Sequence, residues 1–185
     1  MVRRCVLLAL AACCMVAADG RLASAATAEG KLFRAGAFAA DITPQKFPIS
    51  VNGSTQDRQA TGSHDTLHAR CLVLDDGATK LAIVVCDSCA IYREVMDEAK
   101  QLAEKTVGIP GSNVLISATH THSAPSSVSV FQSDADVDYQ RHLAQQIAKG
   151  IQQAHAQLEP ARLAWAVGSD PTQVFNRRWY LKEGT

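Results

Sequence analysis

The sequence lacks an excess of charge of either sign, because 18 basic residues balance 18 acidic ones. It also lacks any cluster of lysine or arginine longer than a short pair. Proteins that bind nucleic acid normally carry a basic patch that neutralises the phosphates. A nucleic-acid-binding function is therefore excluded. With 47% of its 185 residues apolar, the chain has the composition of one globular domain with a substantial core.

The main apolar run, residues 5–18, is too short to span a bilayer comfortably. Two arginines precede it, and small residues that include an Ala-x-Ala cleavage site at 23–25 follow it. This order is typical of an export signal. We expect a signal peptide at 1–25, a linker at 26–33, and a periplasmic or secreted protein. Two alternatives stay open, namely a bacterial lipoprotein carrying lipid on Cys13 and an uncleaved anchor.

The chain also lacks the cysteines for a closed disulfide framework. Three remain after the signal, Cys71, Cys86 and Cys89, and an odd number cannot all pair within one chain. Cys86 and Cys89 enclose two residues where a predicted strand meets a predicted helix, and a helix amino terminus lowers a thiol pKa. Because Cys86 closes an apolar run, we interpret it as a core residue, and thiol redox chemistry is kept as an alternative.

The regular elements predict an α/β fold. Residues 34–44 are expected to form a strand that ends in a proline turn, followed by a polar loop to about His64. Apolar segments at 67–74 and 80–86 flank Asp-Asp-Gly, which predicts a β-hairpin. If Leu74 faces Lys80 across this hairpin, Cys71 faces Ile83 and Cys86 faces His68. A bridge between Cys71 and Cys86 is then not expected.

A helix is predicted over 90–106, because its apolar residues share one face and a Gly-Ile-Pro stop follows. Either Asp87 or Ser88 is the expected amino-terminal cap. With the strand at 80–86 and another at 113–119, this helix makes a βαβ unit with parallel strands.

The second half of the chain adds three expected elements. A second helix is predicted over 137–157 and a strand over 161–168. The last residues, 174–185, have the pattern of a strand and a turn with no later segment to pair with. We therefore expect a mixed sheet with helices packed on it, in an incomplete domain.

The candidate site follows the strand at 113–119, in the sequence Thr-His-Thr-His-Ser. Ligands gather beyond the carboxyl ends of parallel strands, and the ends of 80–86 and 113–119 bring Asp87, His120 and His122 to one edge. In extended backbone, residues two apart point to the same side. Both imidazoles can then bind one zinc ion, or one can bind while the other faces a substrate. An ordinary polar loop is the alternative.

Two metallohydrolase patterns were weighed against this histidine pair. The metallo-β-lactamase pattern, His-x-His-x-Asp-His, is rejected because Ala124 and Pro125 stand at its last two positions. An amidohydrolase barrel would carry His-x-His after its first strand. Here the pair follows a hairpin and a crossover helix, so the barrel is a poor match. His64, in the loop before the hairpin, is a further candidate to reach the site and, like Asp87, to contact substrate.

Taken in order, four motifs resemble the neutral/alkaline non-lysosomal ceramidase family. They are Asp-Ile-Thr at 41–43, Gly-x-His at 62–64 before Ala-Arg at 69–70, Thr-His-Thr-His-Ser at 119–123, and Asn-Arg at 176–177. The resemblance covers essentially all of the chain after the signal, so 34–185 is expected to be the amino-terminal part of such a hydrolase.

The resemblance implies a zinc amidase that cleaves the N-acyl bond of ceramide into fatty acid and sphingoid base. It implies that His120 is a zinc ligand and that His122 and Arg177 contact substrate, with Arg178 as an alternative to Arg177. The family's remaining ligands, a second His, a Glu and a Tyr, are expected downstream of residue 185, as is its serine motif. A lipid amide substrate would bring the enzyme into contact with a membrane surface. The rival hypothesis is a non-catalytic fragment or binding module that keeps the fold.

Overall fold

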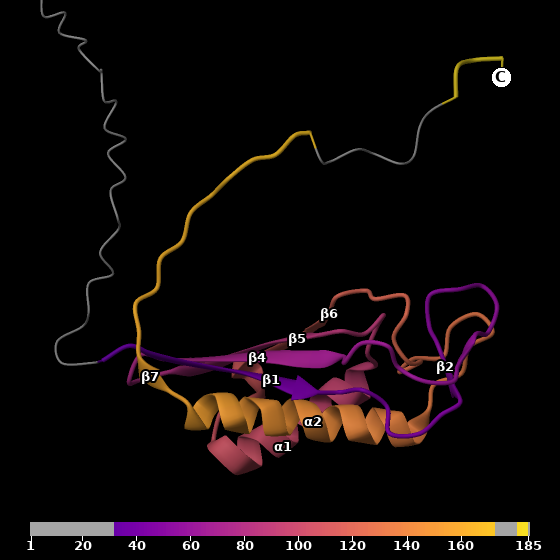
Figure 1. Ribbon diagram of the computed structural model, residues 1–185. Helices are drawn as coiled ribbons and strands as arrows, with labels where there is room; N and C mark the ends of the chain where they lie inside the picture. The colour runs from indigo at the N-terminus through magenta and orange to yellow at the C-terminus, as the bar shows by residue number, and fades with distance from the viewer. Residues whose placement is uncertain (1–31, 173–180, 185) are drawn as a thin grey trace, which may run out of the picture. The chain divides into compact units, whose positions relative to one another are not determined.

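The computed structural model describes residues 32–172 and 181–184 (Figure 1). Of the described residues, 32–163 belong to the larger compact unit. The described residues after it contain no helix or strand. The predicted signal peptide, the lipidation candidate Cys13, the predicted strand at the end of the chain and Arg177 lie outside the described residues.

A five-stranded mixed sheet forms the centre of the larger unit, in the order β6-β5-β4-β1-β7. Its strands are β1 (Arg34–Asp41), β4 (His68–Asp75), β5 (Lys80–Cys86), β6 (Val114–Ala118) and β7 (Glu159–Pro160). β4 pairs antiparallel with both β1 and β5, whereas β5 and β6 are parallel. The loop after β1 contains a small second sheet of β2 (Ile49–Ser50) and β3 (Gln59–Ala60). The predicted α/β fold, β-hairpin and βαβ unit are confirmed.

Two helices, α1 (Arg93–Val107) and α2 (Val137–Ala156), pack on the same face of the sheet (Figure 1). A single 3-10 turn, η1 (Gly111–Asn113), leads from α1 into β6. Three residues of α2 spaced four apart, Leu143, Ile147 and Ile151, are fully buried. This spacing places them on one face of the helix, against β1 and β4.

The predicted start of α1 is wrong, because neither Asp87 nor Ser88 caps the helix. The helix begins three residues later than expected, after Tyr92, which makes no side-chain cap. The Asp87 carboxylate accepts hydrogen bonds from the main chain of His68 and the side chain of Arg70. The Ser88 hydroxyl donates to the carbonyl of Ala90. Both side chains stabilise the irregular segment that precedes the helix. The predicted end of the helix is confirmed, because Gly108 follows the last helical residue with a left-handed backbone, φ 68°.

The predicted register of the hairpin is wrong by one residue. Asp75, not Leu74, faces Lys80, so that Cys71 faces Val84. Asp75 stays in the strand because its buried carboxylate lies 2.6 Å from a guanidinium nitrogen of Arg34 and accepts a hydrogen bond from the Gly77 N–H. In the observed register Cys86 faces Ala69, so Cys71 and Cys86 are not opposite each other, and both thiols are free.

The predicted strand at 161–168 does not form. Only Glu159 and Pro160 pair with β1, and the Ala161 N–H still donates to the carbonyl of Phe33. The residues that follow are irregular, and Leu163 is 64% exposed. Alternating apolar residues make a strand only where a neighbouring strand accepts their main-chain hydrogen bonds.

The face of the sheet opposite the helices is apolar and open in the part of the chain that the structure describes. Leu72, Leu81 and Leu115, from three adjacent strands, are 36%, 43% and 60% exposed. Parallel strands in α/β proteins are usually covered on both faces. Within the described ranges, no helix has the length and apolar character to cross a bilayer.

Candidate metal centre

His120 and His122 lie just beyond the carboxyl end of β6, with their rings in contact. The ring centroids are 4.5 Å apart in a T-shaped arrangement, and the two Nε2 atoms are 3.0 Å apart. The expectation that extended backbone would bring them together is wrong. His120 has φ 61°, in the left-handed region, and a turn at His122 follows. A tight reversal of the chain makes the two rings converge.

The proton on one ring nitrogen of His120 is fixed by its surroundings. Nδ1 of His120 lies 2.9 Å from the main-chain oxygen of Cys89. A carbonyl oxygen can only accept a hydrogen bond, so Nδ1 carries the proton and donates it. In neutral His120 the lone pair is then on Nε2, the atom that faces His122. Histidines that bind metals are commonly held by such a backbone carbonyl.

The loop that carries the histidines is attached to the end of β5. The main-chain N–H of Thr119 donates to the carbonyl of Cys86, and that of Thr121 donates to the carbonyl of Ser88. These bonds continue the parallel pairing of β5 and β6 for a few residues beyond the strands. The topology of the βαβ unit therefore sets the position of the histidine pair.

The segment between β2 and β3 also supports this loop, although it lies more than 60 residues earlier in the chain. Val51 bridges to Pro125, and a guanidinium nitrogen of Arg58 donates to the carbonyl of His122 over 2.7 Å. Gly53, at φ 103°, lies so close to the His122 ring that a Cβ placed on it would be 2.4 Å from Cγ. Only glycine fits there, so Gly53 and Arg58 are positioning residues for His122.

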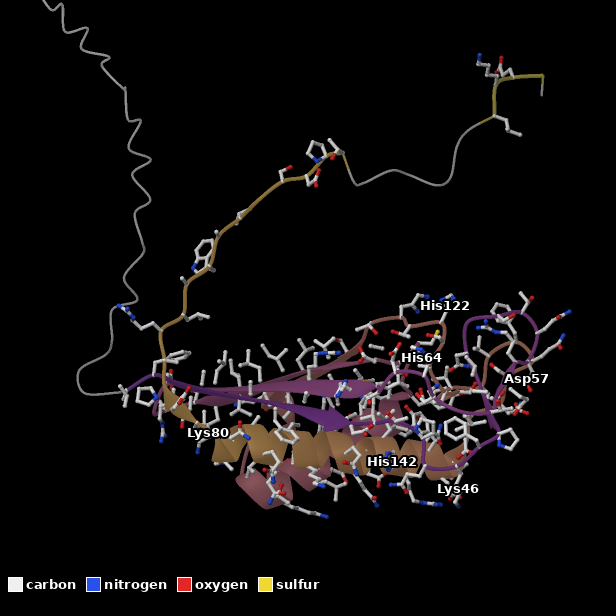
Figure 2. All side chains as sticks on the ribbon, viewed as in Figure 1. Lys46, Asp57, His64, Lys80, His122 and His142 are labelled. Atoms are coloured by element: carbon white, nitrogen blue, oxygen red, sulfur yellow. The ribbon has the colours of Figure 1, made fainter. Side chains whose placement is uncertain are left out.

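The other described candidates, His64 and Asp87, are engaged in contacts of their own. His64 is exposed on its loop, with Nδ1 3.1 Å from a carboxylate oxygen of Asp65. Figure 2 shows His64 and His122 at one end of the sheet, and Lys80 at the other. Burial alone would raise the pKa of Asp87, but its bonds to Arg70 and His68 and the Arg70 charge outweigh this effect and lower the pKa. The carboxylate therefore stays ionised, and its oxygens accept hydrogen bonds from these two residues.

The geometry weakens the thiol redox alternative. Burial raises the pKa of Cys86 to about 12 and also raises the pKa of Cys89. A redox pair needs an accessible thiolate. Cys89 instead contacts the histidine pair, with Sγ 3.8 Å from Nδ1 of His120. The prediction missed this contact, although the adjacent ends of β5 and β6 could have indicated it.

The geometry defines a class of site, in which nitrogen and sulfur donors cluster at the carboxyl edge of a parallel strand pair in an α/β fold. One donor atom each from Cys89, His120 and His122 lies within 4.8 Å of the other two. Such donor types suit zinc and related transition metals. The class is that of an α/β protein with a candidate metal centre.

Comparison with known proteins identifies the family. Residues 33–179 match the family described as neutral/alkaline non-lysosomal ceramidase, N-terminal. The chain belongs to this family, as its four motifs predict. It is 29% identical over 160 residues to the neutral ceramidase of Pseudomonas aeruginosa and 30% identical over 151 residues to neutral ceramidase A of Dictyostelium discoideum. These alignments cover 80% and 76% of this chain, and 24% and 21% of the relatives.

The fold leads to the same family. The crystal structure of neutral ceramidase from Pseudomonas aeruginosa superposes with a TM-score of 0.63 at 26% identity, over 70% of this chain and 22% of that one. A structure described as ceramidase complexed with C2 gives a TM-score of 0.62 at 28% identity. The chain thus spans less than a quarter of the length of these relatives.

Proposed function

We propose that this chain is the amino-terminal part of a zinc-dependent amide hydrolase that cleaves the N-acyl bond of ceramide or a related lipid amide. Its relatives named neutral ceramidase support the substrate class. The observation that carries the metal dependence is the histidine pair, with Nε2 atoms 3.0 Å apart and the His120 proton held on Nδ1.

The donors fit a zinc ion. Nitrogens bound to tetrahedral zinc at 2.0 to 2.1 Å stand about 3.3 Å apart, so the observed 3.0 Å needs only a few tenths of an ångström of movement. A zinc ion with one open coordination position would polarise an amide carbonyl and lower the pKa of a bound water molecule. The Cys89 carbonyl holds the His120 proton on Nδ1, so that the lone pair on Nε2 is available to the ion. Gly53 and Arg58 keep His122 next to that nitrogen.

His120 is the proposed zinc ligand, and His122 lies close enough to share the ion or to contact the substrate. His64 and Arg177 are proposed to bind substrate, His64 because it lies on a loop at the same end of the sheet (Figure 2). Asp87 was proposed for the same role, but its carboxylate oxygens are already bonded to Arg70 and His68, so we assign it to shaping the edge.

Removal of metal tests the proposed function in the complete natural protein that carries this segment. Dialysis against a chelator should abolish release of fatty acid from an N-acyl sphingosine, and added zinc should restore it, because the proposed zinc ion would supply the Lewis acid that polarises the amide carbonyl. Added magnesium should not restore it, since imidazole nitrogens bind magnesium poorly. Hydrolysis that persists without metal would contradict the proposal.

The Gly53→Ala variant tests the packing around His122. The new methyl group would overlap the His122 ring, and alanine is strained at φ 103°. The ring must leave its present position beside His120, so zinc affinity should fall by about 10- to 100-fold, the usual effect of losing a group that orients a metal ligand. Equilibrium dialysis with zinc measures this change.

Gly62→Ala is the matched control, because a Cβ on Gly62 meets no atom within 4 Å. It should bind zinc as the wild-type chain does, and circular dichroism should show both variants folded. Equal zinc affinity in Gly53→Ala and Gly62→Ala would mean that the position of His122 does not matter for the ion.

A further inference from the structure

We propose that Ser127 is a positioning residue that keeps the proton of His120 on Nδ1. Ser127 acts through the segment 88–90, by holding the carbonyl of Cys89 against that nitrogen. The inference rests on the proposed function, since His120 is the proposed zinc ligand. It deepens that function by tracing the support of the ligand, through a buried hydroxyl, to a helix that packs on the sheet.

The segment 88–90 is irregular, and each of its three main-chain carbonyls accepts a hydrogen bond from the loop 119–127. The three donors are the Thr121 N–H to Ser88 over 3.1 Å, Nδ1 of His120 to Cys89 over 2.9 Å, and the Ser127 hydroxyl to Ala90. Because these carbonyls belong to successive residues, a bond to the last of them restricts rotation of the peptide groups on either side of Cys89.

Two buried hydroxyls bond to the carbonyl of Ala90, and they differ in what they join. Ser88 and Ser127 are both 0% exposed, with their Oγ atoms 3.1 Å apart. The Ser88 hydroxyl donates to Ala90 over 2.9 Å, which closes a turn inside the segment. The Ser127 hydroxyl comes from a part of the chain 37 residues later. The Ser127 bond therefore fixes where the segment lies, whereas the Ser88 bond fixes only its local shape.

Ser127 is itself held by α2. The carbonyl of Ser127 accepts a hydrogen bond from Nε2 of Gln140 over 2.9 Å. The carbonyl of the preceding residue, Ser126, accepts one over 3.0 Å from the N–H of Asp136, the amino-terminal cap of α2. One face of α2 is buried against the sheet. A continuous series of hydrogen bonds thus joins a well-packed helix to the segment 88–90.

The consequence of this support concerns the tautomer of His120. A neutral imidazole carries one proton, and the partner of one ring nitrogen decides which nitrogen holds it. A fixed carbonyl at Nδ1 keeps the proton there and leaves the lone pair on Nε2. If the Cys89 carbonyl shifts, the proton redistributes between the two nitrogens, and the fraction with a protonated Nε2 cannot bind a metal through that atom.

Ser127→Ala in the full 185-residue chain, without metal, tests the inference. Heteronuclear NMR of the neutral imidazole nitrogens should show the His120 proton mainly on Nδ1 in the wild-type chain and shared between both nitrogens in Ser127→Ala. The spectrum of His120→Ala identifies which signals belong to His120. In the complete natural protein that carries this segment, Ser127→Ala should lower zinc affinity by about 10- to 100-fold, as measured by equilibrium dialysis.

Ser88→Ala is the matched control, because it removes an equally buried hydroxyl and leaves the bond from Ser127 to Ala90 in place. It should keep both the His120 tautomer and the zinc affinity of the wild-type protein. In either variant the Ala90 carbonyl retains one hydroxyl donor, so both should fold, as circular dichroism can check.

The outcomes separate this inference from the proposed function. A wild-type tautomer in Ser127→Ala would overturn the role of Ser127. An equal redistribution in Ser88→Ala would also overturn it, since the effect would then follow the loss of either buried hydroxyl. A redistribution confined to Ser127→Ala, in a complete protein that binds no zinc, would support the role of Ser127 and contradict the proposed metal dependence.

Ser127→Cys decides the matter if Ser127→Ala does not fold. The thiol is close in size to the hydroxyl and is a weak donor, so the bond to Ala90 is weakened while the space stays filled. The His120 proton should then redistribute in the same direction as expected for Ser127→Ala, but to a smaller extent. A His120 spectrum identical to that of the wild-type chain, in folded Ser127→Cys, would overturn the inference.

Discussion

His120→Ala should weaken zinc binding by between about 100- and 1000-fold. Zinc sites with four protein donors bind with roughly 10 to 16 kcal/mol, or about 3 to 4 kcal/mol for each donor, and a factor of ten in affinity is about 1.4 kcal/mol. His120 is the donor with the best-fixed lone pair, because its Nδ1 proton is held by the Cys89 carbonyl. Its loss removes the central member of the cluster.

The matched control is His155→Ala. The charges of Lys80 and Asp75 act on His155, which places it at the hairpin end of the sheet, and Figure 2 shows Lys80 at the end away from His122. Zinc affinity should change by less than about twofold in this control, as measured by equilibrium dialysis. Equal zinc affinity in His120→Ala and His155→Ala would contradict the ligand assignment.

Gly36→Ala should destabilise the larger unit by about 3 kcal/mol or more, at the upper end of the range for overpacked cores. Gly36 lies in β1, under the end of α2. A Cβ there would be 2.1 Å from the carbonyl oxygen of Ala154 and 2.9 Å from main-chain atoms of Gln157 and Leu158. Main-chain atoms cannot rotate away as a side chain can, so the helix must shift off the sheet.

Urea denaturation measures this loss as a lower free energy of unfolding. Gly111→Ala is the control, since a Cβ on Gly111 makes ordinary contacts at 3.6 Å and 3.8 Å with the side chains of Lys100 and Glu104. It should change the free energy of unfolding by less than about 0.5 kcal/mol, as is usual for surface positions. A stability of Gly36→Ala close to that of the control would show that α2 can adjust at no cost.

Sequence patterns predicted the elements that have a strong local signal. The alternating segments at 67–74 and 80–86 became β4 and β5, and the leucine and isoleucine spacing in 137–157 became α2. The small sheet of β2 and β3 was missed, because two-residue strands in a polar loop carry no periodicity. The strand at 161–168 was predicted from a local apolar segment, and such a segment does not reveal whether a partner strand exists.

The candidate site was predicted in part. The order of strands and helix placed His120 and His122 at the carboxyl edge of the sheet, where the structure has them. Their convergence depends on the left-handed backbone of His120, and their support depends on Gly53 and Arg58. Contacts between segments so far apart in the chain have no local signature, so sequence reasoning could not find them.

The open apolar face of the sheet links the folding of this segment to its associations. Leu72, Leu81 and Leu115 keep part of their surface in contact with water there. Any surface that covers them adds roughly 25 cal/mol of stabilisation per Å² of apolar area removed from solvent. Docking and folding then behave as coupled equilibria, so that a substitution which lowers the stability of the fold also lowers the apparent affinity for whatever covers this face.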